Sequence, residues 1–164
     1  MPIRKTSQGW FWGSKGPFDT KAKAMAVGRA AYASGYKENI MNSNAVAEFI
    51  ATLLHSATIT HFMHLQATGP GSYARHIALG DYYDNIVELT DALAESIQGA
   101  YGLITEYPTE FRTVGETPLS YIKKLKAYVT ETRAELPQDS NIQNDIDAIA
   151  TLLDSTAYKL EFLA

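Results

Sequence analysis

The four histidines of this sequence lie close together in the chain, at His55, His61, His64 and His76. His64 shares a helical face with Leu53 and Ala57, and His61 lies one turn before it. A single histidine on an apolar face is most often a core residue. Several neighbouring histidines also suit a metal ion, because neutral imidazole is a common ligand for iron and zinc. This stretch is therefore the first candidate for a metal site.

Carboxylates follow on the next predicted helix. Counting ~100° per residue from His76 places four acids on one side of that helix: Asp84, Glu88, Asp91 and Glu95. Such an acidic flank is most often a solvated surface. Together with imidazole, however, carboxylates form a ligand set that suits iron, and helical bundles build such sites from inward-facing His and acidic residues. The chain has no cysteine, so any metal site must use His, Asp or Glu.

Apolar residues spaced by threes and fours predict four long helices. Their expected starts are Ser43 or Asn44, Ser72, Thr117-Pro118, and Asp139 or Ser140. The connection from about Gly99 to Thr117 is long for a compact domain, which predicts a crossover between two parallel helices. We therefore expect an all-α fold, a ferritin-like four-helix bundle over residues 41–164 with the crossover between its second and third helices.

Residues 1–40 form a basic segment of different character. The run from Trp10 to Phe18, WFWGSKGPF, predicts a short extended piece or hairpin, and a short helix should follow from Lys21 to about Ser34, capped by Asp19 or Thr20 and stopped by Gly35. The segment holds seven Lys/Arg against two acids, whereas residues 41–164 hold seven against sixteen. Phosphate contacts with DNA are one interpretation, with the candidate residues Arg4, Lys5, Lys15, Lys21, Lys23 and Arg29. The clustered aromatic rings equally favour docking against a neighbouring subunit.

Two stretches of the sequence resemble a known family. The residues from His64 to His76, HLQATGPGSYARH, are similar to the junction in Dps proteins, the small iron-oxidising, DNA-protecting relatives of ferritin, where a histidine ends one helix and another opens the next. The run from Leu79 to Glu95, LGDYYDNIVELTDALAE, resembles the Dps second helix, with Asp91 and Glu95 at the positions of its Asp and Glu. The resemblance is nearest to the divergent Dps-like proteins of bacteriophages.

The resemblance implies an iron(II)-oxidising site between subunits, with both histidines from one subunit and the Asp/Glu pair from its two-fold mate. His64, His76, Asp91 and Glu95 are then the expected metal ligands and catalytic residues. The resemblance also implies iron storage and DNA protection in a cage-forming homo-oligomer of twelve subunits. Iron is the expected metal and zinc the alternative.

One position departs from the family pattern. Dps proteins carry an Asp four residues after the second histidine, where this sequence has Gly80. Asp81 and Asp84 are the nearest carboxylates, but Asp81 lies ~100° further round the helix and Asp84 lies a turn away. A second interpretation is therefore a Dps-like assembly without ferroxidase activity, which binds DNA or has a structural role. A monomeric helical adaptor without metal is the third.

The sequence offers no membrane or secretory signal. No apolar run approaches the roughly 20 residues that a membrane helix needs, and the N-terminus lacks the layout of a signal peptide. We therefore expect a soluble protein in the cytoplasm.

Overall fold

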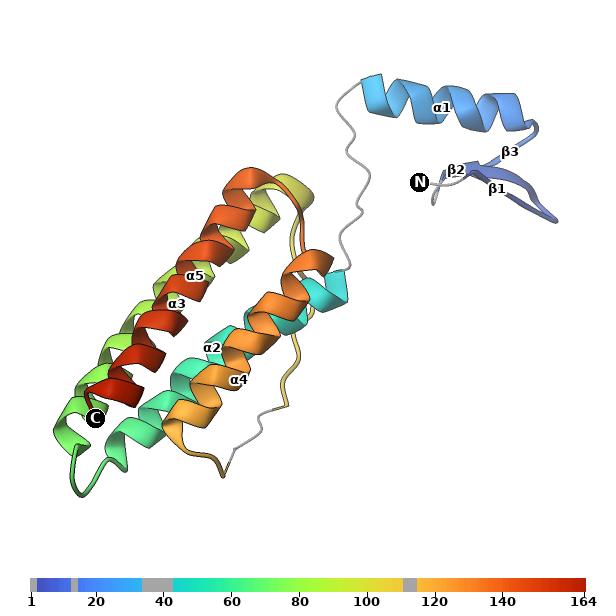
Figure 1. The fold of residues 1–164 in the computed structure, drawn as a ribbon. Helices are drawn as coiled ribbons and strands as arrows, with labels where there is room; N and C mark the ends of the chain where they lie inside the picture. The colour runs from blue at the N-terminus through green and yellow to red at the C-terminus, as the bar shows by residue number, and fades with distance from the viewer. Residues whose placement is uncertain (1–2, 13–14, 34–42, 111–114) are drawn as a thin grey trace. The chain divides into compact units, whose positions relative to one another are not determined.

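A computed structural model describes residues 3–12, 15–33, 43–110 and 115–164 of the chain. These residues separate into two compact units, Met1–Ile40 and Met41–Ala164. Most of the described chain is helical, with one small sheet (Figure 1). The predicted stop of the first helix at Gly35 lies outside the described residues.

The first unit is a three-stranded antiparallel sheet followed by one helix. Strands β1 (Ile3–Thr6), β2 (Gly9–Trp12) and β3 (Lys15–Phe18) pair in chain order. Helix α1 (Lys21–Ala33) follows, and the Thr20 hydroxyl accepts a hydrogen bond from the Lys23 amide at its start. The extended aromatic segment and the short helix were predicted, whereas strand β1 was not.

Trp12 joins the sheet to the helix of this first unit. Its side chain is 4% exposed, and Ala24 of α1 is fully buried. A Cβ atom at Gly28 would lie 2.6 Å from Trp12 Nε1. The absence of a side chain at Gly28 therefore lets the indole pack directly against the helix.

The second unit is a bundle of four helices: α2 (Ser43–Leu65), α3 (Ser72–Tyr101), α4 (Pro118–Thr132) and α5 (Ser140–Phe162). A short 3-10 turn, η1 (Arg133–Glu135), follows α4. Helix α3 packs against α2 and α5, and α4 packs against α5 and α2. The connection after α3 runs back along the bundle, so that α4 begins near the end at which α3 begins (Figure 1). The predicted crossover between parallel helices is therefore present in the bundle.

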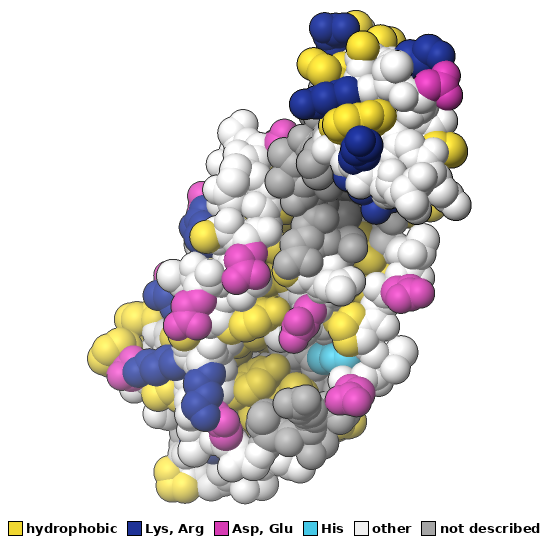
Figure 2. Space-filling model, turned by 90° about the vertical axis from the view of Figure 1, so that its right-hand side faces the viewer, with side chains coloured by type: hydrophobic (Ala, Val, Ile, Leu, Met, Phe, Trp, Pro, Cys, Tyr) yellow, Lys and Arg dark blue, Asp and Glu magenta, His cyan; other side chains and the backbone are white. Residues whose placement is uncertain are grey.

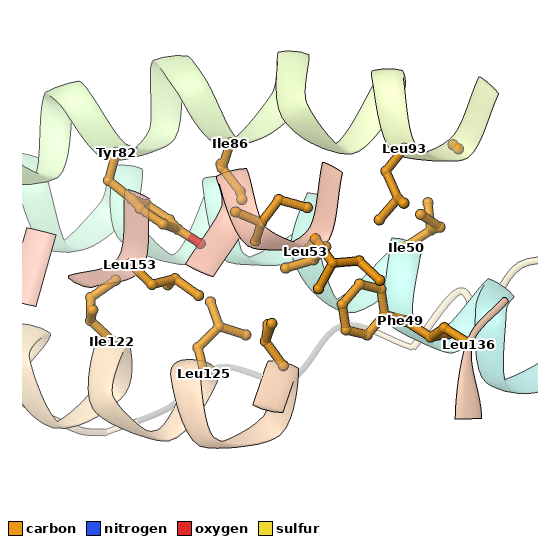
Figure 3. Close-up of a cluster of buried hydrophobic side chains, with 14 of the residues drawn as sticks. Phe49, Ile50, Leu53, Tyr82, Ile86, Leu93, Ile122, Leu125, Leu136 and Leu153 are labelled. Carbon is orange, nitrogen blue, oxygen red and sulfur yellow. The ribbon is translucent and has the colours of Figure 1, made fainter. Parts of the chain in front are cut away.

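The core of the bundle consists largely of the apolar residues whose spacing predicted the helices. Buried side chains from all four helices meet along the bundle (Figure 3), among them Phe49, Leu53, Tyr82, Ile86, Leu93, Ile122, Leu125 and Leu153. The ring of Phe49 stacks on that of Tyr128, with the ring centroids 5.8 Å apart. Burial of these apolar surfaces is the main source of stability for such a bundle.

Two predicted helix starts differ in detail from the structure. Gly71, not Ser72, is the N-cap of α3, and its φ of 73° favours glycine. Asp139 is the N-cap of α5, but it makes no side-chain cap hydrogen bond and instead accepts one from the Tyr101 hydroxyl. Thr117 caps α4 as predicted, since its hydroxyl accepts from the Ser120 amide at 3.3 Å.

Within the described ranges, no helix combines the length and the apolar character that crossing a membrane requires.

Candidate metal site

His64 and His76 are brought together where α2 ends and α3 begins. Their imidazole rings stack with centroids 3.5 Å apart and an angle of 24° between the ring planes. His64 Nδ1 lies 2.8 Å from the carbonyl oxygen of His76, and His76 Nδ1 lies 3.2 Å from the carbonyl oxygen of His64. Each ring is therefore oriented by the backbone of the other residue.

These two contacts determine the tautomers of the rings. A carbonyl oxygen only accepts hydrogen bonds, so each Nδ1 must carry the proton and donate it. The neutral ring then has its lone pair on Nε2, which is the atom that binds a metal ion. Histidine ligands in metal sites are commonly held in this way, with the other ring nitrogen bonded to a backbone carbonyl. In their neutral forms both rings therefore carry the lone pair on Nε2 and the proton on Nδ1.

Two further rings surround the pair. Tyr83 of α3 stacks on His61 with centroids 4.3 Å apart, and its ring lies edge-on to His64 at 5.2 Å. His61 also contacts His64 edge-on, at 5.9 Å. The sequence analysis used Tyr83 only as part of the helical periodicity and not as a site residue, although its position seven residues after His76 places it on nearly the same side of α3. These contacts limit the freedom of the His64 ring.

Asp91 and Glu95 lie away from the histidines of the same chain. Both are exposed on α3. At about 1.5 Å per residue, Asp91 lies about 22 Å and Glu95 about 28 Å along the helix from His76. Across residues 3–12, 15–33, 43–110 and 115–164, no three His, Asp or Glu side chains are grouped so that they could hold one metal ion. One copy alone therefore brings together the two histidines but not all four predicted ligands.

The two substitute ligands considered for the Gly80 position do not join the pair. The carboxylate of Asp81 binds Lys159 of α5, with Oδ2 and Nζ 2.8 Å apart. Asp84 is exposed one turn further along α3. A Cβ atom built at Gly80 would lie 3.5 Å from both Cε1 and Nδ1 of His64. Position 80 therefore faces the ring of His64, but no side chain occupies it.

A separate cavity of about 580 Å³ lies between α2, the crossover connection and α4. Its lining includes His55, Glu48, Glu110 and Tyr121. Burial, together with the charge of Glu116, raises the pKa of Tyr121 to about 12. Sequence analysis did not predict this cavity, because its lining comes from segments far apart in the chain and has no local signature.

The basic residues of the first unit lie beside its aromatic rings. The Arg4 guanidinium lies 5.4 Å from the centroid of the Phe11 ring, and the Lys5 and Lys21 ammonium groups lie 5.6 Å and 5.7 Å from the Trp10 ring. Figure 2 shows Lys and Arg side chains next to hydrophobic ones on this unit.

The other predicted DNA contacts in this unit are also exposed. They are Lys15, Lys23 and Arg29. Lys23 pairs with Asp19 at 2.6 Å, which holds the pKa of that carboxyl below its usual value. The cation–π contacts of Arg4, Lys5 and Lys21 orient their charged groups without neutralising them.

A protein-family model described as a family of unknown function, DUF5856, matches residues 64–160. The match begins at His64 and includes His76, Gly80, Asp91 and Glu95, while the first unit lies outside it. No curated protein and no solved structure matches the chain.

Proposed function

We propose that this chain, which belongs to the DUF5856 family of unknown function, binds and oxidises iron(II) at a site shared by two copies. The observation that supports this most strongly is the pair formed by His64 and His76, whose Nδ1 atoms are both bonded to backbone carbonyls. The two Nε2 atoms then serve as two of the ligands of an iron(II) ion. Asp91 and Glu95 of a second, two-fold-related copy complete the ligand set.

The distances along α3 support a shared site over a site within one chain. Asp91 and Glu95 are exposed and lie about 22 Å or more from His76 along the helix. In a two-fold dimer, a contact between one part of the surface and another part of the partner occurs twice, so such a dimer can bring the acids of each copy to the histidines of the other. Each dimer then has two equivalent sites.

The bundle is consistent with a ferritin-like architecture. Helices α2 and α3 form one antiparallel pair, α4 and α5 form another, and a long crossover joins them (Figure 1). Ferritin-like proteins have this connectivity. We extend the proposal to a dodecameric cage in the cytoplasm that stores the oxidised iron as mineral.

Iron is the substrate of the proposed reaction. Two iron(II) ions each lose one electron, and one hydrogen peroxide molecule takes up both electrons and two protons to give two water molecules. Oxygen is the alternative oxidant, and zinc the alternative metal. The residues of the chain hold the ion, and the carbonyl hydrogen bonds keep both imidazoles in the form that binds it.

A second candidate function is a DNA-binding or structural assembly without ferroxidase activity. The observations that favour it are the absence of a side chain at Gly80 and the exposed basic residues of the first unit. In this case the bundle still assembles, and Arg4, Lys5, Lys15, Lys21, Lys23 and Arg29 contact phosphates. DNA binding combined with iron oxidation, as in the first candidate function, corresponds to protection of DNA against oxidative damage.

Iron(II) titration under air, followed by absorbance, tests the proposal. The mass of the same protein in solution is measured in parallel. We expect rapid oxidation by a large assembly, a loss of most of that rate in His76→Ala, and no loss in His55→Ala, whose histidine lines the separate cavity. Oxidation no faster than in buffer, by an intact assembly, would favour the second function.

A further inference from the structure

The cavity beside α2 has the size of a small-molecule site. Its volume is about 580 Å³, and small-molecule sites in proteins occupy roughly 300–1,000 Å³. Its lining comes from three segments that are distant in the chain: α2, the crossover connection from Pro108 to Glu110, and Tyr121 of α4. Close-packed proteins leave few voids larger than a water molecule. A hollow of this size, with polar side chains on several sides, therefore suits a ligand rather than a packing void.

A smaller hollow of about 260 Å³ adjoins this cavity. It shares Glu48 with the cavity and adds Glu106 and Tyr107 of the connection. Asn44 lines the smaller hollow and Ile59 lines the cavity, and these residues lie about 22 Å apart along α2 at 1.5 Å per residue. The two hollows together form one elongated groove, the α2 groove, which suits a long ligand better than a compact one.

The connection is anchored to the bundle before it reaches the α2 groove. Ile104 is 8% exposed and belongs to the hydrophobic core. Its amide donates a hydrogen bond to Gln98 Oε1 at 3.1 Å. These contacts fix the start of the connection against α3, so the groove has a wall on the side opposite α2.

The α2 groove favours a positively charged ligand. Its carboxylates are Glu48 of α2 and Glu106 and Glu110 of the connection. Neither hollow has a lysine or an arginine among the lining residues that the structure describes. A hollow lined by charges of one sign concentrates ligands of the opposite sign. An anionic ligand is therefore disfavoured.

The groove also offers apolar and aromatic surface beside its carboxylates. Ala51, Ile59 and Pro108 line the cavity together with the ring of Tyr121. Burial raises the pKa of Tyr121 to about 12, so the phenol stays neutral near pH 7. An aromatic face attracts an ammonium group, and the aliphatic walls can cover methylene groups. The ligand should thus combine ammonium groups with hydrocarbon.

We propose that the α2 groove binds a linear polyamine, a chain of methylene groups that carries several ammonium groups. The ammonium groups pair with Glu48 and the carboxylates of the connection, and the methylene groups lie against the apolar walls. Alkyl ammonium groups resemble the lysine side chain, so they are charged at neutral pH. This site does not depend on the proposed iron site, because His64 and His76 line neither hollow.

Calorimetric titration of the full-length protein with spermidine tests the proposal. The compound 1,8-octanediol is the matched probe, because it is a chain of similar length without charge. The variant Glu48→Gln with Glu110→Gln keeps the size of both side chains and removes their charge. The control variant, Glu88→Gln with Glu131→Gln, removes the same charge from exposed positions outside the groove.

We expect saturable binding of spermidine and none of 1,8-octanediol. The groove variant should bind spermidine about tenfold more weakly, the sum of two modest ammonium–carboxylate pairs, and the control variant less than about twofold more weakly. Equal losses in the two variants would show attraction to the acidic protein as a whole and overturn the proposal. Equal binding of both probes, or no binding of spermidine, would also overturn it. Circular dichroism of each variant shows that the helices are intact.

Discussion

The hydroxyl groups of Tyr82 and Ser56 lie 2.7 Å apart inside the bundle and link α3 to α2. Both residues are fully buried. Ser56 donates its own hydrogen to the carbonyl oxygen of Leu53 at 2.6 Å, so the Tyr82 hydroxyl is the donor to Ser56. Burial raises the pKa of Tyr82 well above its ordinary value, and the Ser56 contact opposes this only in part.

This direction of donation predicts unequal effects of two substitutions. Tyr82→Phe removes the donor and leaves the Ser56 hydrogen bonded, so it should lower the free energy of unfolding by about 0.5–1.5 kcal/mol. Ser56→Ala leaves a buried phenol without its acceptor and should cost about 1–3 kcal/mol. Urea denaturation followed by circular dichroism measures both. A larger loss in Tyr82→Phe than in Ser56→Ala would contradict the assigned donor.

The raised pKa of Tyr121 predicts a loss of stability at high pH. Burial and the charge of Glu116 raise this pKa to about 12, against an ordinary value of 10.0. Below the ordinary value both the folded and the unfolded chain keep the proton. Between the two values only the unfolded chain releases it, so the free energy of unfolding falls as the pH rises through this window.

Denaturation at about pH 9, below this window, and at about pH 11.5, near its upper end, measures the change. The fall in stability should be smaller in Tyr121→Phe than in the wild type. Tyr158→Phe is the matched control, because the Tyr158 ring is 56% exposed at the surface of α5. An identical fall in all three proteins would show that the Tyr121 proton does not contribute.

The same substitution should have opposite effects at two helical glycines. Gly80→Ala adds a Cβ atom in ordinary contact with the His64 ring at 3.5 Å and should stabilise the bundle by about 0.5–1 kcal/mol. Gly28→Ala places a Cβ atom 2.6 Å from Trp12 Nε1 and should destabilise the first unit by about 1–3 kcal/mol through overpacking. Thermal unfolding followed by circular dichroism reports on the bundle, and tryptophan fluorescence, which comes from Trp10 and Trp12, reports on the first unit. Stabilisation by both alanines would show that the indole moves away at little cost.

The basic residues of the first unit predict salt-dependent DNA binding. Each phosphate contact contributes about 0.9 to the slope of log affinity against log salt concentration. Arg4→Gln with Lys5→Gln should therefore weaken binding of a DNA duplex and reduce that slope by about 2. Lys123→Gln with Lys126→Gln is the control, because these lysines pair with Glu161 and Asp154 in the bundle. Equal losses in both double variants would indicate a general charge effect.

Much of the bundle could be predicted because its signals are local. Apolar spacing marks the helices, and Thr117-Pro118 marks the start of α4 by its capping and proline chemistry. The start of α3 was placed at Ser72, and the structure puts the cap at Gly71, because the left-handed backbone of glycine ends the turn there. Strand β1 was missed, since four residues with one apolar side chain give too weak a pattern.

The sequence singled out the two histidines that meet in the structure, but it did not indicate their geometry, and Asp91 and Glu95 lie away from them in the same chain. Helical spacing and the resemblance to Dps proteins selected His64 and His76. No sequence pattern, however, indicates that each imidazole ring donates a hydrogen bond to the backbone carbonyl of the other histidine. The contacts of Tyr83 and the cavity around His55 depend on how separate helices pack. Such contacts join residues distant in the chain, so they become visible only in the folded structure.

Mixed assemblies give the sharpest test of a site shared by two copies. Chains with His64→Ala and His76→Ala keep their acids, and chains with Asp91→Ala and Glu95→Ala keep their histidines. Each variant alone has no complete site and should not oxidise iron(II). In a mixed dimer, however, the histidines of one chain meet the acids of the other at one of the two sites. Equal mixing and reassembly should therefore restore about a quarter of the wild-type rate, because half of the dimers are mixed and each has one intact site. Assemblies that remain inactive after mixing, with both chains shown to be present, would place the ligands within one chain or exclude the site.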